Sequence, residues 1–376
     1  MISDRERPKG PPVRGFCSVL LATVLSLAAA TCGPHARSTA EAEEQAEVTF
    51  IATSDSHYDA FEHEDRNARN RATLKHMNAI AGIAWPDELG GGTIGRPAGV
   101  VVLGDLIDDG DRRKNGKNQT ERQWAFYTED FGLDGTDGRL AWPVLETWGN
   151  HDGPPVGEER FGFSPQARLV ARNRERLRKG LLDHLSENGL HGSWDWGPVH
   201  LVLAGIYPAD EQHPDVRYNR VWHDPQGALT FVKKDLEAHV GDSGRPVLVM
   251  AHCGFDTDWW HKDDWKAFYE TVRPYNVIAY LHGHTGTGLR QYKPEDAEGP
   301  PLTVINTGQT ENGFFVIRVT RDRLRAAYRC KRAKRWRDDA GERHYQWDGS
   351  WQWKHVLEKP LDPSLASRSA EAAGKP

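Results

Sequence analysis

Five short apolar stretches of the chain are each followed by Asp, Asn or His, the residue types that bind divalent metals. These residues are Asp55 and His57, Asp105 and Asp108, Asn150, His151 and Asp152, His252, and His282 and His284. Imidazole favours zinc and iron, and carboxylate and amide oxygens admit manganese. A water held between two such ions loses its proton near neutral pH, and the ions also hold phosphate oxygens. The set therefore predicts a dinuclear metal site with hydrolytic chemistry.

The stretches before these residues are expected to be strands that are buried on both faces. They are continuous apolar runs at residues 48–53, 98–103, 144–147, 247–251 and 277–281. Such runs are typical of a sheet covered by helices. Helical patterns lie between them at residues 67–83, 119–130, 167–187, 228–240 and 264–272. This alternation predicts an α/β domain, in which ligands bind at the carboxyl edge of the strands.

Antiparallel patterns follow in the second half of the chain. Residues 193–205 read as a hairpin joined at Gly197-Pro198, and residues 303–331 read as consecutive strands. Residues 345–353 have Asp348-Gly349 at their centre, which is a hairpin signal. From residue 47 onward we therefore expect three parts. They are a main domain over residues 47–332, an extra C-terminal β-hairpin over residues 333–359, and a disordered Ser/Ala/Pro-rich tail over residues 360–376.

The N-terminus has the pattern of a secretory signal. Four basic residues precede an uncharged run over residues 15–34, whose apolar centre is too short for a membrane span. Cys32 follows Ala29-Ala30-Thr31, which resembles a bacterial lipoprotein cleavage site, although ordinary signal cleavage nearby is the alternative. We expect residues 1–32 to be a signal peptide and residues 33–46 a linker. The protein would then be periplasmic, secreted, or tethered to a membrane through lipidated Cys32.

The charge of the chain limits the partners it can have. The formal net charge is −6, and residues 1–32 hold four basic and two acidic side chains, so the mature chain is at −8. An acidic protein of this kind is not built for general nucleic-acid binding. Cys253 and Cys330 are the cysteines left after cleavage. A disulfide between them and two buried thiols are both open.

Taken together, the motifs resemble those of the calcineurin-like metallophosphoesterase superfamily. Its pattern is Asp-x-His, Gly-Asp-x-x-Asp, Gly-Asn-His-Asp/Glu, a single His, and then Gly-His-x-His. The matching motifs here span residues 48 to about 331. The resemblance implies a four-layer αββα sandwich with two divalent metal ions, zinc, manganese or iron, at the strand ends.

The resemblance also implies a role for each matching residue. Asp55 and His57 would bind the first metal, and Asp105 would bridge both. The second metal would be bound by Asn150, His252 and His284. His151 would give a proton to the leaving group or steady the transition state. Asp108 and Asp152 would orient the ligands from behind.

The last motif departs from the family pattern. It reads Gly283-His284-Thr285-Gly286, so glycine stands where the first metal's remaining histidine is expected. That metal keeps Asp55, His57 and Asp105, and its site is expected to be weak. His282 is a candidate replacement, but it precedes His284, whereas the missing ligand should follow it. A supporting or core position is favoured for His282.

Two further stretches admit two interpretations each. Trp259 and Trp260 closely follow His252, and they could form a substrate wall or pack the loop; packing is slightly favoured. Residues 329–337 carry six basic side chains and no acidic one. They could bind a polyanion or a lipid headgroup. However, Arg323, Arg325, Arg329 and Lys331 share alternate positions, with Ala327 as the one apolar exception, and this favours the solvated face of an edge strand.

The sequence thus predicts an exported metal-dependent phosphoesterase that hydrolyses a phosphate mono- or diester by attack of a metal-bound hydroxide. One alternative is a non-catalytic phosphoester-binding protein with a degenerate first-metal site. It is disfavoured because a decayed site has no reason to keep His151 beside the second metal's ligands. An exported nuclease is disfavoured by the acidic charge. Substrate, ester class and oligomeric state are left open.

Overall fold

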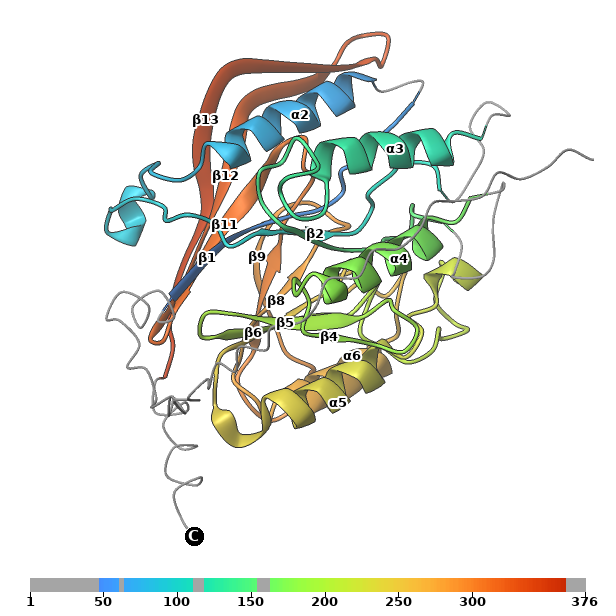
Figure 1. Cartoon of the computed structure of the whole chain (residues 1–376), viewed down its shortest axis with the longest axis vertical. Helices are drawn as coiled ribbons and strands as arrows, with labels where there is room; N and C mark the ends of the chain where they lie inside the picture. The colour runs from blue at the N-terminus through green and yellow to red at the C-terminus, as the bar shows by residue number, and fades with distance from the viewer. Residues whose placement is uncertain (1–46, 61–63, 111–117, 154–162, 363–376) are drawn as a thin grey trace, which may run out of the picture. The chain divides into compact units, whose positions relative to one another are not determined.

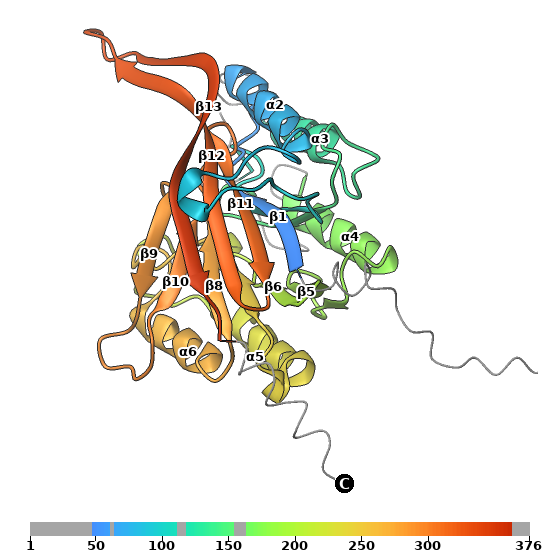
Figure 2. The same cartoon turned by 90° about the vertical axis from the view of Figure 1, so that its left-hand side faces the viewer.

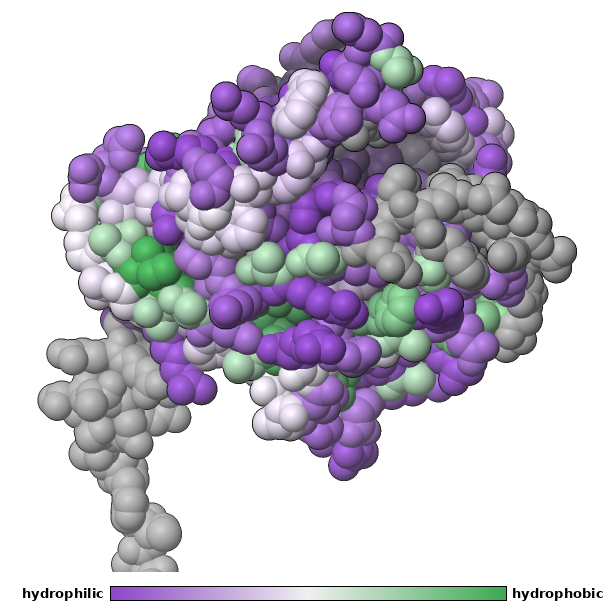
Figure 3. Space-filling model, turned by 90° about the horizontal axis from the view of Figure 1, so that it is seen from above, coloured by the Kyte–Doolittle hydropathy of each residue, from purple (hydrophilic) through white to green (hydrophobic). Residues whose placement is uncertain are grey.

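The computed structural model describes residues 47–60, 64–110, 118–153 and 163–362. The expected signal peptide, the linker and most of the expected tail lie outside the described residues. No helix within the described ranges is long and apolar enough to cross a membrane. Seen from above, hydrophilic residues cover most of the face shown, and hydrophobic residues gather in a few small patches (Figure 3).

The first sheet has six strands in the order β13-β12-β11-β1-β2-β3. Its parallel part consists of β1 (Glu47–Thr53), β2 (Val100–Leu103) and β3 (Val144–Thr147). Its antiparallel part consists of β11 (Gly313–Thr320), β12 (Arg323–Arg337) and β13 (Arg343–Pro360). The N-terminal and C-terminal strands of the described chain therefore share one sheet, with β1 pairing directly with β11.

The second sheet has seven strands in the order β4-β5-β6-β7-β8-β10-β9. Four of them run parallel: β6 (Val199–Leu203), β7 (Val247–Met250), β8 (Val277–His282) and β10 (Leu302–Asn306). Antiparallel strands close both ends: β4 (His184–Leu185), β5 (Gly192–Trp196) and β9 (Gly288–Tyr292). The expected hairpin over residues 193–205 is β5 and β6.

Helices cover the outer faces of the two sheets. They are α2 (Glu64–Asn78), α3 (Thr120–Phe131), α4 (Pro165–Arg178), α5 (Ala228–His239) and α6 (Lys262–Val272), with short 3-10 turns at Asp87–Leu89, Val221–His223 and Gly241–Ser243. Figures 1 and 2 show α2 and α3 on one outer side and α5 and α6 on the other. The four-layer αββα sandwich expected from the sequence is confirmed.

Alternation of side chains along the strands divides the core between the layers. Phe50 and Ala52 of β1 lie in an apolar cluster with residues of the second sheet, such as Met250. Ile51, between them, lies in the cluster that includes Met77 of α2. Successive residues of a strand point to opposite faces, so a strand buried on both faces reads as a continuous apolar run. This is why the central strands could be recognised from the sequence.

The helix expected over residues 167–187 was predicted too long. It is α4, and it ends at Arg178 because Gly180 adopts a left-handed backbone with φ 71°. The Leu181 N–H then donates to the Arg176 carbonyl at 2.9 Å, and the Gly180 N–H donates to the Leu177 carbonyl at 3.1 Å. This pair of bonds is a Schellman motif, which terminates a helix. The chain is then free to form β4.

The hairpin turn expected at Asp348-Gly349 was also placed wrongly. The turn between β12 and β13 is at residues 338–342, where the Asp338 carboxylate accepts the N–H groups of Ala340 at 3.0 Å and Glu342 at 2.9 Å. Asp348 instead accepts the Ser350 N–H within β13. A register shift beside it makes this segment a bulge. The expected boundary at residue 332 falls inside β12, so the hairpin continues the first sheet.

Both cysteines of the described chain are free and buried. Cys330 lies in β12 of the first sheet, whereas Cys253 follows β7 of the second. Of the two interpretations left open by the sequence, the structure has two buried thiols.

Candidate metal centre

The five motif segments meet at the carboxyl edge of the parallel strands. Backbone hydrogen bonds join the loop after β1 to the loop after β2: Asp55 N–H donates to Gly104 O, and His57 N–H donates to Asp105 O, each at 2.9 Å. The His252 ring, after β7, lies with Nδ1 2.7 Å from the Leu103 carbonyl. Because that carbonyl is an acceptor, the contact fixes the Nδ1 proton and leaves Nε2 facing the cluster.

Asp105 lies at the centre of the cluster. Its Oδ2 is 3.3 Å from His252 Nε2 and 3.6 Å from His57 Nε2. Its Oδ1 accepts the His151 N–H at 2.9 Å. Metal–ligand bonds of about 2.0–2.2 Å at ordinary angles put neighbouring donor atoms about 3–3.6 Å apart. The carboxylate therefore has the spacing of a ligand shared between two groups of donors.

Several overlapping groups of donor atoms surround Asp105. Each group has its atoms within 4.8 Å of one another: Asp55, Asp105 and His252; His57, Asp105 and His151; His252, Cys253 and His284. Asn150 Oδ1 is 3.0 Å from His252 Nε2, and the His284 N–H donates to Asp55 Oδ2 at 2.9 Å. The residues expected as metal ligands thus converge. The assignment of each one as a ligand to a particular ion stays a prediction.

Four of these residues have a left-handed backbone conformation, which residues other than glycine rarely adopt. The φ angles are 49° at Asp55, 43° at His57, 51° at Asp105 and 65° at His284. Left-handed backbone at a residue other than glycine costs of order 1–3 kcal/mol, and such strain concentrates at functional sites. Four strained residues in one cluster are a structural sign of function that the sequence does not contain.

Two glycines of the motifs are required because neighbouring side chains lie against their Cα atoms. A Cβ on Gly149 would collide with the Asp105 carboxylate and lie 2.7 Å from His252 Nε2. A Cβ on Gly283 would collide with the Ser54 side chain and lie 2.6 Å from Asp55 Oδ2. Real Cβ atoms do not approach so closely, so each glycine lets the candidate ligands lie against the backbone.

The electrostatics of the cluster favour positive charge at its centre. Burial by itself lowers the pKa of His57, but the carboxylates of Asp108, Asp55 and Asp105 outweigh it and raise that pKa to about 10. Burial likewise lowers the pKa of His252, and Asp105 and Asp55 raise it to about 9. Donors that stabilise cationic imidazoles this strongly also suit divalent cations, so the residues present fit a metal centre.

Asp152 and Asp108 bind groups of the loops that carry the candidate ligands, and their supporting role stays a prediction. Buried Asp152 accepts three backbone N–H groups, from Leu106 at 2.9 Å, Ile107 at 3.0 Å and Gly149 at 2.7 Å. It thereby ties the loop after β2 to the loop after β3. Asp108 Oδ1 is 3.2 Å from His57 Nδ1, which orients that ring.

His151 is placed to transfer a proton. Its Nδ1 is 2.7 Å from the Asp108 carbonyl oxygen, and this acceptor requires a proton on Nδ1. Nε2 is then the nitrogen left for chemistry. The His151 ring lies edge-on to the His57 ring with centroids 4.7 Å apart. This geometry agrees with the expected role of a proton donor, which stays a prediction.

The segment with the missing histidine bends between β8 and β9, with left-handed backbone at His284 and Gly286. Gly286 has φ 68°, and a Cβ there would meet nothing within 4 Å. His282 is buried with Nδ1 2.8 Å from the Gly283 carbonyl, and its ring lies against Gly254. Among the described residues, His282 belongs to no group of three donors. Its placement agrees with a supporting position rather than with a replacement ligand.

Arg66 near the site was not identified from the sequence, and Trp259 was named there only with two open interpretations. Arg66 of α2 donates from Nη1 to Asp108 Oδ1 at 2.9 Å and to the His57 carbonyl at 3.2 Å. No sequence signal marks it, because a helix arginine nine residues after His57 is ordinary. Trp259 lies edge-on to His284 with ring centroids 4.5 Å apart, whereas Trp260 is wholly buried in the core.

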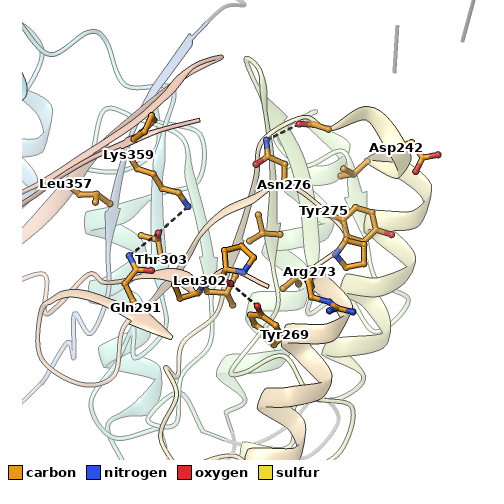
Figure 4. Close-up of a pocket in the computed structure, with 18 of the residues that line it drawn as sticks. Asp242, Tyr269, Arg273, Tyr275, Asn276, Gln291, Leu302, Thr303, Leu357 and Lys359 are labelled. Atoms are coloured by element: carbon orange, nitrogen blue, oxygen red, sulfur yellow. Dashed lines mark hydrogen bonds between the residues drawn. The ribbon is translucent and has the colours of Figure 1, made fainter. Parts of the chain in front are cut away.

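A cavity of about 940 Å³ lies at the opposite edge of the second sheet. Residues at the starts of β8 and β10 line it, such as Val277 and Leu302, whereas the metal-binding types follow the other end of β8. Figure 4 shows Tyr269, whose hydroxyl donates to Pro300 O, and Lys359, whose ammonium lies by Thr303. No group of metal-binding side chains among the described residues lies there. The cavity is therefore separate from the candidate metal centre.

A sandwich of two sheets with carboxylate, amide and imidazole groups at one edge defines a metal-binding class of α/β protein. The chain belongs to the calcineurin-like phosphoesterases, whose family model matches residues 48–287. That span contains all five motifs, and the resemblance noted from the sequence is confirmed. No curated protein matches the sequence.

Several solved structures are similar in fold. The purple acid phosphatase PPD1 of yellow lupin shows 14% identity and a TM-score of 0.47, over 85% of this chain and 55% of that one. GAP50, the anchor in the inner membrane complex of Plasmodium, shows 11% and 0.42, over 88% and 96%. The NAD nucleotidase of Haemophilus influenzae shows 11% and 0.35, over 87% and 56%. Likenesses this distant carry no argument about activity.

Proposed function

We propose that the protein is a metal-dependent hydrolase of phosphate mono- or diesters. The observation that carries this is the convergence of candidate ligands on Asp105, with the His151 ring beside them. The family supports a phosphoester bond as the target. Two divalent cations, zinc, manganese or iron, would supply an activated water and neutralise phosphate charge. The residues that would hold them are Asp55, His57, Asp105, Asn150, His252 and His284.

The side chains of the chain itself perform the remaining steps. Asp108 and Arg66 keep the His57 ring in place, and Asp152 keeps Gly149 and the residues after it against the loop of Asp105. His151 donates a hydrogen bond from Nδ1 to the Asp108 carbonyl, which leaves Nε2 to face the substrate. When both ring nitrogens are protonated, Nε2–H can give its proton to the departing ester oxygen, which would otherwise leave as an alkoxide, and the ring becomes neutral with its remaining proton on Nδ1.

The test is metal analysis of the purified protein together with hydrolysis of p-nitrophenyl phosphate and of bis(p-nitrophenyl) phosphate. We expect bound divalent metal and turnover of at least one ester, which also assigns the ester class. The matched control is Asp105→Asn, which keeps the shape of the shared carboxylate but removes its charge, and which should lose both metal and turnover. A metal-loaded wild type without turnover of either ester would contradict the proposal.

A non-catalytic phosphoester-binding protein is the second candidate, and Gly286 is the observation that favours it. Such a protein would bind inorganic phosphate in the presence of metal but hydrolyse neither ester. The same assay with excess manganese or zinc separates the two. Turnover that appears only on metal addition would mean that the first site is weak and that catalysis is retained.

Export is proposed from the sequence of residues 1–32. Intact-mass measurement of protein from the native host should show a new N-terminus near Cys32. Added acyl mass on Cys32 would indicate a membrane-tethered lipoprotein, and its lack would indicate a periplasmic or secreted protein. A product that still contains residues 1–30 would contradict export.

A further inference from the structure

A second cavity, of about 620 Å³, lies between α2 and the hairpin formed by the ends of β12 and β13. Figure 1 shows the hairpin passing beside α2. The cavity is lined by Asp65, Arg66 and Arg69 of α2, by Glu311, by Arg335, Trp336 and Arg337 of β12, and by His344 and Tyr345 of β13. We call it the arginine cavity. Its lining holds four guanidinium groups and two carboxylates, an excess of positive charge on an acidic protein.

Two of the arginines are already engaged by the carboxylates. Arg69 donates from Nε to Glu311 at 2.5 Å and also pairs with Asp65. Arg335 pairs with the same Glu311 at 3.0 Å. One carboxylate thus serves two guanidinium groups, and this network also fastens the hairpin to α2. Arg66 is paired with Asp108 at 2.9 Å, so in the part of the chain that the structure describes Arg337 is the arginine of the lining without a carboxylate partner.

Two groups in the rest of the lining, the Arg337 guanidinium and the Tyr345 hydroxyl, can still bind a ligand. Arg337 is exposed and donates from Nη1 to the Gly341 carbonyl at 2.7 Å, and within the described ranges it has no carboxylate partner. The Tyr345 hydroxyl is buried and has no hydrogen-bond partner. The centroid of its ring is 4.8 Å from Arg69 Cζ and 5.2 Å from Arg335 Cζ. A buried hydroxyl without a partner is costly unless a ligand or water satisfies it.

The arginine cavity is joined to the candidate metal centre by one residue. Arg66 lines the cavity, and its Nη1 donates to Asp108 Oδ1, which is itself 3.2 Å from His57 Nδ1. His57 belongs to the first-metal side, where Gly286 replaces a histidine. Arg66 therefore touches both the lining of the cavity and the carboxylate that orients a candidate metal ligand.

We propose that the arginine cavity binds a second anionic group, a phosphate or a carboxylate, on the substrate of the metal centre. The proposal rests on the phosphoesterase function proposed above. Guanidinium groups present paired N–H donors that match two oxygens of such a group, which is the geometry of oxyanion recognition. Arg337 and the Tyr345 hydroxyl supply donors, and the exposed face of Trp336 covers the chain that connects the two anions.

The test compares esters that differ only in the second anion. The series are alkyl phosphates, ω-carboxyalkyl phosphates and α,ω-alkanediol bisphosphates of increasing chain length. We expect kcat/KM to be about tenfold higher for a two-anion ester than for the alkyl phosphate at the length that reaches the cavity, since one charge-assisted hydrogen bond contributes about that much. The series that shows the preference distinguishes a phosphate from a carboxylate. Equal kcat/KM at every length would overturn the proposal.

Arg337→Gln separates recognition from simple fastening of the hairpin, because Arg337 lies outside the Glu311 network. This change should reduce the preference for two-anion esters about tenfold, mainly through KM. Lys334→Gln is the matched control: it removes a positive charge from the same hairpin outside the cavity, and the preference should persist. A preference that survives Arg337→Gln would overturn the proposal.

A binding measurement keeps this inference distinguishable from the proposed function. Calorimetry with an alkanediol bisphosphate and the matching alkyl phosphate needs no turnover. If no ester is hydrolysed, but the bisphosphate binds more tightly to wild type than to Arg337→Gln, the proposed function has failed and the cavity is an anion site. If the two ligands bind wild type equally, the cavity proposal has failed even where p-nitrophenyl phosphate is hydrolysed.

Discussion

The candidate metal centre is assembled from side chains whose own backbones are strained. Asp55, His57, Asp105 and His284 each adopt a left-handed φ, and the sheets and loop hydrogen bonds hold them there. Neighbouring glycines allow the close approach. The types of these residues could be predicted from the sequence because they follow apolar strands. Their strain could not, because it arises from contacts between segments that are far apart in the chain.

His151→Ala should lower kcat by about 10²- to 10⁴-fold, the usual contribution of a general acid. Metal content should remain close to that of wild type, because His151 Nδ1 donates to the Asp108 carbonyl and is therefore not free to bind a metal. Metal analysis and steady-state kinetics on the same preparation test both statements. Loss of metal in this variant would make His151 a ligand instead.

Gly286→His tests the missing ligand directly. Nothing lies within 4 Å of a Cβ at this position, so there is room for the ring, but φ of 68° imposes a cost of about 1–2 kcal/mol on any side chain. We expect lower thermal stability together with more metal retained after dialysis. Gly286→Ala is the matched control, since it carries the same backbone strain without an imidazole. Equal metal retention in the two variants would show that position 286 does not face the first site.

At the scale of elements, one buried histidine joins a strand to its covering helix. His200 of β6 lies with Nδ1 2.8 Å from Asp195 of β5 and Nε2 2.7 Å from Asp235 of α5. Asp195 also pairs with Arg245, and the His239 ring faces His200 at 6.3 Å. Burial lowers the pKa of His200, but the two carboxylates outweigh it and raise that pKa above its ordinary value.

The raised pKa predicts a pH-dependent contribution to stability. The folded state binds the proton more tightly than the unfolded state, whose pKa is about 6.5. The stabilisation is therefore fully present below about pH 6.5 and is lost as the pH rises through the folded pKa. The difference in unfolding free energy between wild type and His200→Gln should shrink over that interval in urea titrations. Asp235→Asn removes one carboxylate and should weaken the dependence; a pH-independent difference would contradict the assignment.

Elements were predicted best where burial dictates the pattern. The central strands began and ended close to their expected limits, because continuous apolar runs match burial on both faces of a sheet. Helix α5 did so too, because its buried residues recur at helical spacing. Errors occurred where short-range polar contacts decide the outcome. Gly180 ended α4 early, and Asp338 rather than Asp348 formed the hairpin turn. Either aspartate can stabilise a turn, and only the pairing of β12 with β13 selects between them.

At the scale of the whole molecule, the two metal positions are expected to differ in strength. By the assignment that the family resemblance implies, one position has four protein ligands, namely Asp105, Asn150, His252 and His284, and the other has three, Asp55, His57 and Asp105. Loss of a good ligand commonly weakens a site by more than the 10- to 100-fold seen for supporting residues. Extended dialysis should leave about one metal per chain, and added metal should restore activity. Two metals retained through dialysis would mean that another group completes the first site.

The basic segment over residues 329–337 is not simply a solvated strand face. From the sequence, a solvated edge-strand face was favoured. The structure buries Lys331, whose ammonium donates to Arg69 O and Glu311 O, and directs Arg335 and Arg337 into the arginine cavity. The sequence could not predict this, because it depends on how α2 lies beside the hairpin. Binding of an anion there stays a proposal.

The continuity of β12 has a consequence for how this protein can change. One strand begins in the core of the first sheet and ends in the wall of the arginine cavity, while the candidate metal ligands follow other strands. Its turn at residues 338–342 is exposed, and longer loops cost only slightly more entropy to close. On the proposal that the arginine cavity binds part of the substrate, insertions at that turn would alter substrate choice and leave the candidate metal ligands in place. Selectivity and chemistry would then be separable inheritable traits, and directed evolution of the turn alone would be a route to new substrates.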